Sequence, residues 1–146
     1  MDLEIARWQW DEGSLIGESE MDADHRHFGL LVRDLDRAVA AGANDTILED
    51  QIRLIAHDAL LHFDKEDALH TRYGYPPETS TRKLHNEIGA ILRSLLRKDR
   101  DSLAIDGAAG RKWSLPPAQL KVLLVSHLIY EDAAFRDFLT RERTLG

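Results

Sequence analysis

The sequence predicts an all-α fold, an up-down-up-down antiparallel four-helix bundle with an N-terminal arm. Along four stretches of the chain, apolar residues recur every three or four positions, which is the period of an amphipathic helix. Turn-rich connections separate these stretches, and no stretch alternates with the two-residue period of a strand. Helices joined in this way pack as antiparallel neighbours. The 146 residues suit a single domain, with residues 1–19 as the arm and 20–142 as the bundle.

The first two helices are predicted over residues 20–41 and 45–73. The first stops at AAGAND and the second at YGYPP, because glycine, asparagine and proline favour a helix end. The seam of a helix is the stripe that faces the core, and in the first helix it reads Met21, His25, Phe28, Val32, Leu35 and Val39. In the second it reads Leu48, Ile52, Ile55, Ala59, His62, Glu66 and Leu69. Both seams therefore carry polar side chains at positions that are expected to be apolar.

The third helix is predicted over residues 78–98 and the fourth over 116–142, with a glycine-containing loop between them. The fourth begins at two prolines, which the first turn of a helix tolerates. The seam of the third helix reads Thr81, His85, Ile88, Leu92 and Leu95. The apolar face of the fourth reads Leu120, Leu124, His127, Leu128, Phe135 and Phe138. These two seams also carry a histidine each.

Composition excludes several classes of function. The chain has no cysteine, so disulfides, thiolate metal sites and a cysteine nucleophile are ruled out. A net charge of -7 argues against binding nucleic acid, which needs clustered Lys and Arg. The first residues, MDLEIARWQWDEG, do not read as a signal peptide, and the longest apolar run, VLLVSHLIY, is too short to span a bilayer. We therefore expect a cytoplasmic protein without a membrane partner.

The four seam histidines, one on each predicted helix, point to a metal site. A single core histidine is usually structural, but burying an unpaired imidazole or carboxylate costs several kcal/mol, so a bundle that does this on every helix needs a shared partner. Iron or another divalent metal is the economical partner, because neutral imidazole and carboxylate are natural ligands for it. His62 and Glu66 are four residues apart and project from one helical face. The candidate ligands are His25, His62, Glu66, His85 and His127.

The acid that accompanies His127 stays open from spacing alone. Glu131 lies one turn on and about 40° around the helix from His127. Asp132 lies about 140° around, although it is in line with Leu124 and Leu128. Helix geometry alone does not decide between Glu131 and Asp132.

These residues resemble those of the bacterial hemerythrins over nearly the whole chain. WDEGSLIGESEMDADH resembles the N-terminal arm and first ligand segment of that family, with an Asp three residues before a His. HFDKEDALHTRYGYP is similar to the family's HFxxEE…YP stretch, and HLIYED to its final His-x4-Asp motif. The order of these motifs along the chain is more specific than any one of them.

The resemblance implies a non-haem di-iron centre, with an oxo or hydroxo bridge, that binds dioxygen reversibly. By position, His25 and His62 hold the iron with an open coordination place, and His85 and His127 hold the other. Glu66 and Asp132 bridge the two irons, a choice over Glu131 that rests on the resemblance only. The resemblance also implies a dry oxygen pocket, which keeps out water and protons that would leave the irons ferric. Its lining is Phe28, Phe63, Leu124 and Leu128.

The sequence departs from this pattern at Thr81, which stands where the family has a ligating histidine. A neutral alcohol is a poor substitute, so one iron is short of a nitrogen. His70 is a candidate replacement, because it lies one turn beyond Glu66 on the same face. The alternative is that His70 only sits at the helix edge. His27 and His57 lie off the seam and are expected at the surface or behind the ligands.

Three outcomes follow for the second iron: His70 restores the ligand set, water or an open position takes the place, or the metal is lost. The leading function is an oxygen-binding protein for storage, delivery or sensing, which is not an enzyme. The runner-up is a di-iron enzyme acting on peroxide or nitric oxide, which would need an accessible open site and a proton donor. The local candidates for the donor are His70, Tyr73 and Glu131. A structural bundle with incidental metal binding is a third. The C-terminal FRDFLTRERTLG can contact a second copy, but the oligomeric state stays open.

Overall fold

The structure, a computed structural model, describes residues 17–76, 80–98, 115–127 and 132–145. The described residues form helices and connecting turns and contain no strand. The helices are α2 (Ser19–Ala40), α3 (Asp45–Arg72), α4 (Ser80–Arg97), α6 (Pro117–Ser126) and α7 (Asp132–Leu145). Most of the predicted arm lies outside the described residues.

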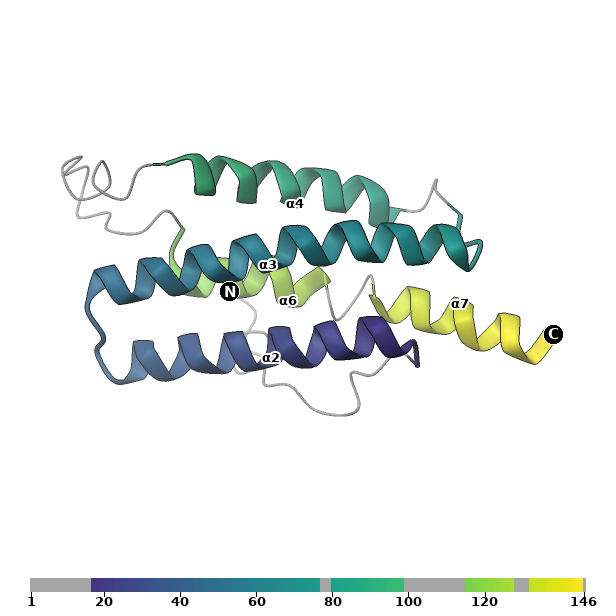
Figure 1. The fold of residues 1–146 in the computed structure, drawn as a ribbon, viewed down its shortest axis with the longest axis horizontal. Helices are drawn as coiled ribbons and strands as arrows, with labels where there is room; N and C mark the ends of the chain where they lie inside the picture. Colours follow the sequence, from purple (N-terminus) through teal and green to yellow (C-terminus); the bar gives the residue numbers. More distant parts are fainter. Residues whose placement is uncertain (1–16, 77–79, 99–114, 128–131, 146) are drawn as a thin grey trace.

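The helices form the predicted antiparallel bundle. The long helix α3 lies between α2 and α4 and also packs against α6 (Figure 1). Along the chain, α2 runs in one direction, α3 returns, α4 runs back again, and α6 and α7 follow the direction of α3 (Figure 1). The all-α prediction and the up-down-up-down topology are therefore confirmed. The predicted fourth helix is described as α6 and α7, and residues 128–131 between them lie outside the described residues.

Side-chain caps and glycines set the ends of α2 and α3. The Glu18 carboxylate accepts a hydrogen bond from the backbone N–H of Glu20, at 2.7 Å, and so satisfies a free donor at the start of α2. The Asn44 side chain does the same for the N–H of Ile47, at 3.0 Å, at the start of α3. After each helix comes a glycine with positive φ, Gly42 at 71° and Gly74 at 73°, a backbone conformation that other residues rarely adopt.

The core consists of two apolar clusters. The larger contains Leu35, Leu48, Ile52, Ile55, Ala56, Ala59, Phe63, Ile88, Leu92, Leu95, Leu120 and Leu124. The smaller contains Met21, Leu69, Phe135 and Leu139. Along α2, His25 falls between Met21 and Leu35, and along α3, Glu66 falls between Phe63 and Leu69. A buried polar layer therefore separates the two clusters, and both clusters hold its helices in place.

Departures from the predicted burial pattern include Val39, Glu49 and Lys121. Val39, predicted in the seam of the first helix, is 48% exposed in the last turn of α2. Glu49 and Lys121, which the pattern does not place in the core, are 1% and 7% exposed. Each of these two is paired: Glu49 Oε1 lies 3.0 Å from Arg53 Nε, and Lys121 Nζ lies 2.8 Å from Asp36 Oδ2. Pairing offsets the cost of burying each charge.

Candidate metal centre

The polar layer brings together the predicted ligands from four helices. His25 comes from α2, His62 and Glu66 from successive turns of α3, His85 from α4, and His127 from the end of α6. Glu66 is completely buried, with 0% of its surface exposed. The exposed fraction of His25, His85 and His127 is 4% or less. The His62 side chain is 17% exposed, so it stands at the edge of the layer.

The donors form two groups that share one carboxylate. His25, His62 and Glu66 make one group, and Glu66, His85 and His127 make the other. In each group the potential ligand atoms lie within 4.8 Å of one another. Glu66 Oε2 lies 2.7 Å from His62 Nε2, whereas Oε1 lies 3.6 Å from His85 Nε2 and 3.5 Å from His127 Nε2. One oxygen of Glu66 thus faces each group.

The spacing of the imidazoles fits metal ligation. The Nε2 atoms of His25 and His62 are 3.2 Å apart, and those of His85 and His127 are 3.1 Å apart. Two imidazole nitrogens bonded to one metal at about 2.1 Å and at right angles lie about 3.0 Å apart. Each pair therefore needs little movement to accept a divalent metal, and the buried imidazole and carboxylate donors are those that iron binds.

In each group, the Nδ1 atom of one histidine contacts a carboxylate from a neighbouring helix. His85 Nδ1 lies 2.8 Å from Asp67 Oδ1, and because a carboxylate can only accept, Nδ1 donates and Nε2 keeps its lone pair for a metal. His62 Nδ1 lies 3.4 Å from Asp24 Oδ2. This contact with His62 lowers the pKa of Asp24, against the opposing effect of partial burial.

Sequence reasoning missed Asp24 and Asp67. Each follows or precedes a candidate ligand in the chain, as Asp24-His25 and Glu66-Asp67, and each contacts a histidine of a neighbouring helix. An acid adjacent to a ligand is therefore the signal that could have found them.

His70 lies next to the second group. It is 5% exposed, and its Nε2 lies 3.6 Å from Glu66 Oε1. Its ring is stacked at 6.2 Å from that of His85 and packs at 4.4 Å against Phe135 and 4.8 Å against Tyr75. His70 therefore lies inside the bundle beside Glu66, although it is not a member of either compact group.

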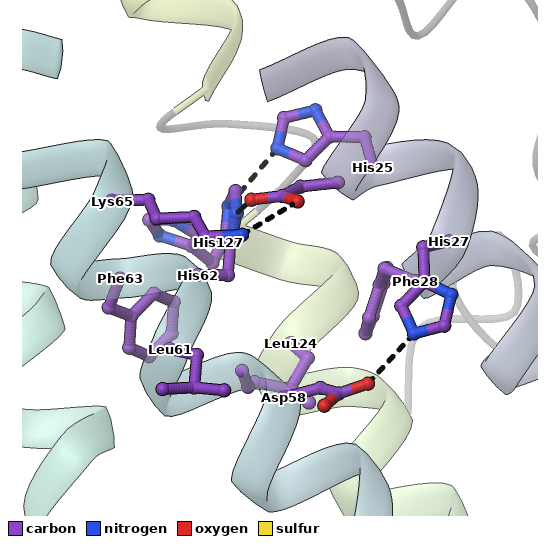
Figure 2. Close-up of a pocket in the computed structure, with 12 residues that line it drawn as sticks. His25, His27, Phe28, Asp58, Leu61, His62, Phe63, Lys65, Leu124 and His127 are labelled. Carbon is purple, nitrogen blue, oxygen red and sulfur yellow. Dashed lines mark hydrogen bonds and ion pairs between the residues drawn. The ribbon is translucent and has the colours of Figure 1, made fainter. Parts of the chain in front are cut away.

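A cavity of about 250 Å³ adjoins the first group (Figure 2). Phe28, Phe63 and Leu124, predicted to line an oxygen pocket, line this cavity. The candidate ligands His25, His62 and His127 line it as well. The fourth predicted lining residue, Leu128, lies outside the described residues. The same holds for Glu131, and the side chains of Thr81 and Asp132 are not among those described. The choice between Glu131 and Asp132 therefore stays a prediction.

Phe63 also holds the second group of histidines. Its ring stacks on His85, with centroids 4.5 Å apart and an interplanar angle of 16°, and meets the His127 ring edge-on at 5.2 Å. Both are favoured arrangements of aromatic rings. One apolar side chain thus fixes the orientation of two candidate ligands.

The chain is 30% identical over 104 residues to a bacteriohemerythrin of Ralstonia nicotianae, an alignment that covers 71% of this chain and 70% of that protein. The chain belongs to the bacteriohemerythrin family. The family that its sequence motifs indicated is thus confirmed. No family model matches the chain, and no solved structure matches it. None of the described helices is long and apolar enough to cross a membrane.

Proposed function

We propose that this member of the bacteriohemerythrin family is a non-haem di-iron protein that binds dioxygen reversibly, for storage, delivery or sensing. The observation that carries the proposal is the position of Glu66, which is fully buried and turns one oxygen toward each histidine pair. A carboxylate in that position can bridge two metal ions. Family membership supports iron and dioxygen as the metal and the ligand.

In this proposal each iron is held by one histidine pair. His25 and His62 would hold the iron beside the cavity, and His85 and His127 would hold the other. Glu66, which both donor groups share, and Asp132 would supply the carboxylate ligands common to the two irons. The distances of 3.2 Å and 3.1 Å within the histidine pairs support this assignment.

We further propose that His70 supplies the nitrogen that Thr81 cannot. The burial of His70 and its distance of 3.6 Å from Glu66 Oε1 support the exchange. His70 Nε2, His85 Nε2 and His127 Nε2 all lie 3.5 to 3.6 Å from Glu66 Oε1, so His70 would add its nitrogen on the side of the second pair. The proposed ligand set is therefore altered in geometry but not in the number of histidines.

Two ferrous ions supply the two electrons on which reversible dioxygen binding depends. The protein's part is to hold the ligands and to keep the site dry. Phe28, Phe63 and Leu124 give the cavity an apolar wall beside the His25–His62 pair. Such a wall excludes the water and protons that would make the loss of an electron irreversible. By accepting the Nδ1–H of His85, Asp67 would keep the Nε2 lone pair available for a metal.

The test is to load the purified protein with ferrous iron without air and to count the iron per chain. Dioxygen is then admitted and removed while the visible spectrum is recorded. Two irons and a charge-transfer band that disappears and returns would support the proposal. A protein that binds no iron, or that holds two irons without any response to dioxygen, would contradict it.

A di-iron enzyme acting on peroxide or nitric oxide is the second candidate function. Thr81 favours it, because an incompletely filled coordination sphere leaves a place for redox turnover. The same experiment separates the two. A band that forms once and decays to the ferric state would favour the enzyme, and peroxide and nitric oxide would then be tested as substrates.

A further inference from the structure

The cavity beside His25 and His62 reaches the surface between α2 and α3. Its inner wall is formed by buried groups, including Phe63 and Leu124. Its lining also includes residues that are largely exposed: the His27 and Lys65 side chains at 62% and 61%, and Leu61 at 50%. A lining that runs from buried to exposed residues marks an entrance as well as a chamber.

Two polar bridges cross this entrance from α2 to α3. His27 Nε2 on α2 lies 2.9 Å from Asp58 Oδ2 on α3, and the pair is seen beside Phe28 and Leu124 in Figure 2. The second bridge joins Asp24 Oδ1 to Lys65 Nζ at 3.4 Å. All four bridging residues line the cavity.

Leu61 lies on α3 between the two bridges. It follows Asp58 by three residues and precedes Lys65 by four, so the three side chains share one face of the helix. Opposite them, Asp24 and His27 are three residues apart on α2 and also share a face. The entrance is thus a short window, with a polar bridge on each side and a half-exposed leucine between them.

We propose that small uncharged molecules enter the cavity between α2 and α3 over Leu61, and that the His27–Asp58 bridge is the gate that sets the rate of entry. The location of the entrance does not depend on the metal, but dioxygen as the molecule that uses it rests on the proposed function. The cavity volume of about 250 Å³ exceeds that of dry apolar cavities, about 150 Å³, that take up benzene or xenon.

The bridge is suited to a gate because it is exposed and weak. Polar contacts between exposed side chains contribute little to stability, so this one breaks and re-forms readily as the side chains rotate. Its loss changes the passage but not the inner wall that binds the guest. Association and dissociation therefore speed up by the same factor, about two- to five-fold, while the affinity stays constant.

The experiment measures xenon exchange by NMR in the full chain loaded with zinc, which is redox-inert and takes the same ligands. We expect His27→Ala and Asp58→Ala to raise the exchange rate to the same extent, and the double variant to add nothing. Leu61→Trp, which fills the window from a half-exposed position, is expected to lower it. His57→Ala is the matched control, because His57 lies 3.9 Å from Asp58 and is exposed but does not line the cavity.

If the rate of xenon exchange is unchanged in the His27, Asp58 and Leu61 variants, the proposal that molecules enter between α2 and α3 is wrong. If the variants change the xenon affinity but not its association rate, the His27–Asp58 bridge is not a gate, because a gate changes rates and leaves the affinity unchanged. Dioxygen association and release are then measured in the ferrous-loaded variants. If xenon exchange responds as expected but the wild-type protein shows no reversible oxygen band, the entrance stands and the proposed function fails.

Discussion

The His25–His62 pair and the His85–His127 pair share Glu66 but differ in their surroundings. Both histidines of the first pair line the cavity, as does His127 of the second pair, and the His62 side chain is 17% exposed with a carboxylate oxygen 3.4 Å from its Nδ1. In the second pair both histidines are almost fully buried, and His85 has a carboxylate at 2.8 Å. The two pairs therefore differ mainly at His62, which is more exposed than His85 and has a longer carboxylate contact.

This difference matches two separate tasks. A metal that exchanges a small ligand needs an open side and an apolar chamber, which the first pair has. A metal that must stay in place needs ligands whose rings are fixed, and Phe63 and Asp67 fix His85 from two directions. Under the proposed function, this difference would favour ligand exchange at the first pair and metal retention at the second.

The largest effect is expected from Glu66→Ala, which removes the group common to both halves. The iron content should fall from two toward zero per chain, because Asp132 would be the one carboxylate of the proposed ligand set left to balance the charge of two metals. Elemental analysis of the purified variant checks this. Glu66→Gln keeps the shape but not the charge, and should also lose most of the iron. If either variant retains two irons, Glu66 is not the carboxylate that the two metals share.

The next effect concerns the second half alone. His70→Ala should weaken binding of one of the two irons about tenfold or more, because a ligand is lost where Thr81 has already replaced one. The matched control is His57→Ala, which removes an exposed histidine of the same helix and should leave both irons bound. Iron titration and the visible spectrum check both variants. Identical behaviour of the two would exclude His70 as a ligand.

The carboxylates behind the histidines should differ in importance. Asp67→Asn is expected to lower the affinity for one metal about 10- to 100-fold, because it removes the charged partner that orients His85. Asp24→Asn should cost less than about tenfold, since the contact with His62 is longer at 3.4 Å. Zinc titration of both variants measures the ratio of their metal affinities. An equal loss of metal affinity in the two variants would show that Asp24 and Asp67 support their histidines to the same extent.

The fold and the main donors were predictable because their signals are local. The three- and four-residue spacing places His62 and Glu66 on one helical face wherever that helix lies. Asp24 and Asp67 were missed because the acid that meets an imidazole depends on how neighbouring helices are rotated against each other. The burial of Glu49 was missed for the same reason.

Arg53 illustrates how far such tertiary effects reach. Its guanidinium pairs with Glu49 and also donates to the backbone carbonyls of Leu96 and Lys98 at the end of α4. No pattern within α3 indicates a partner more than 40 residues away. Local spacing therefore predicts which face a residue occupies, but not which groups of another helix will satisfy it.

The smallest effect tests whether the second half is also held by packing. Phe63→Leu should lower the free energy of unfolding by about 1–2 kcal/mol, because the ring contacts with His85 and His127 are lost while most of the apolar volume is kept. Urea unfolding at a fixed metal concentration measures this, and Leu54→Ala, at a position 50% exposed, should change it by no more than about 0.5 kcal/mol. Both irons should still bind, since no ligand has been removed. If release of the tighter metal to a chelator accelerates in Phe63→Leu, packing contributes to retention; if only the unfolding energy changes, the carboxylate of Asp67 alone holds His85 in place.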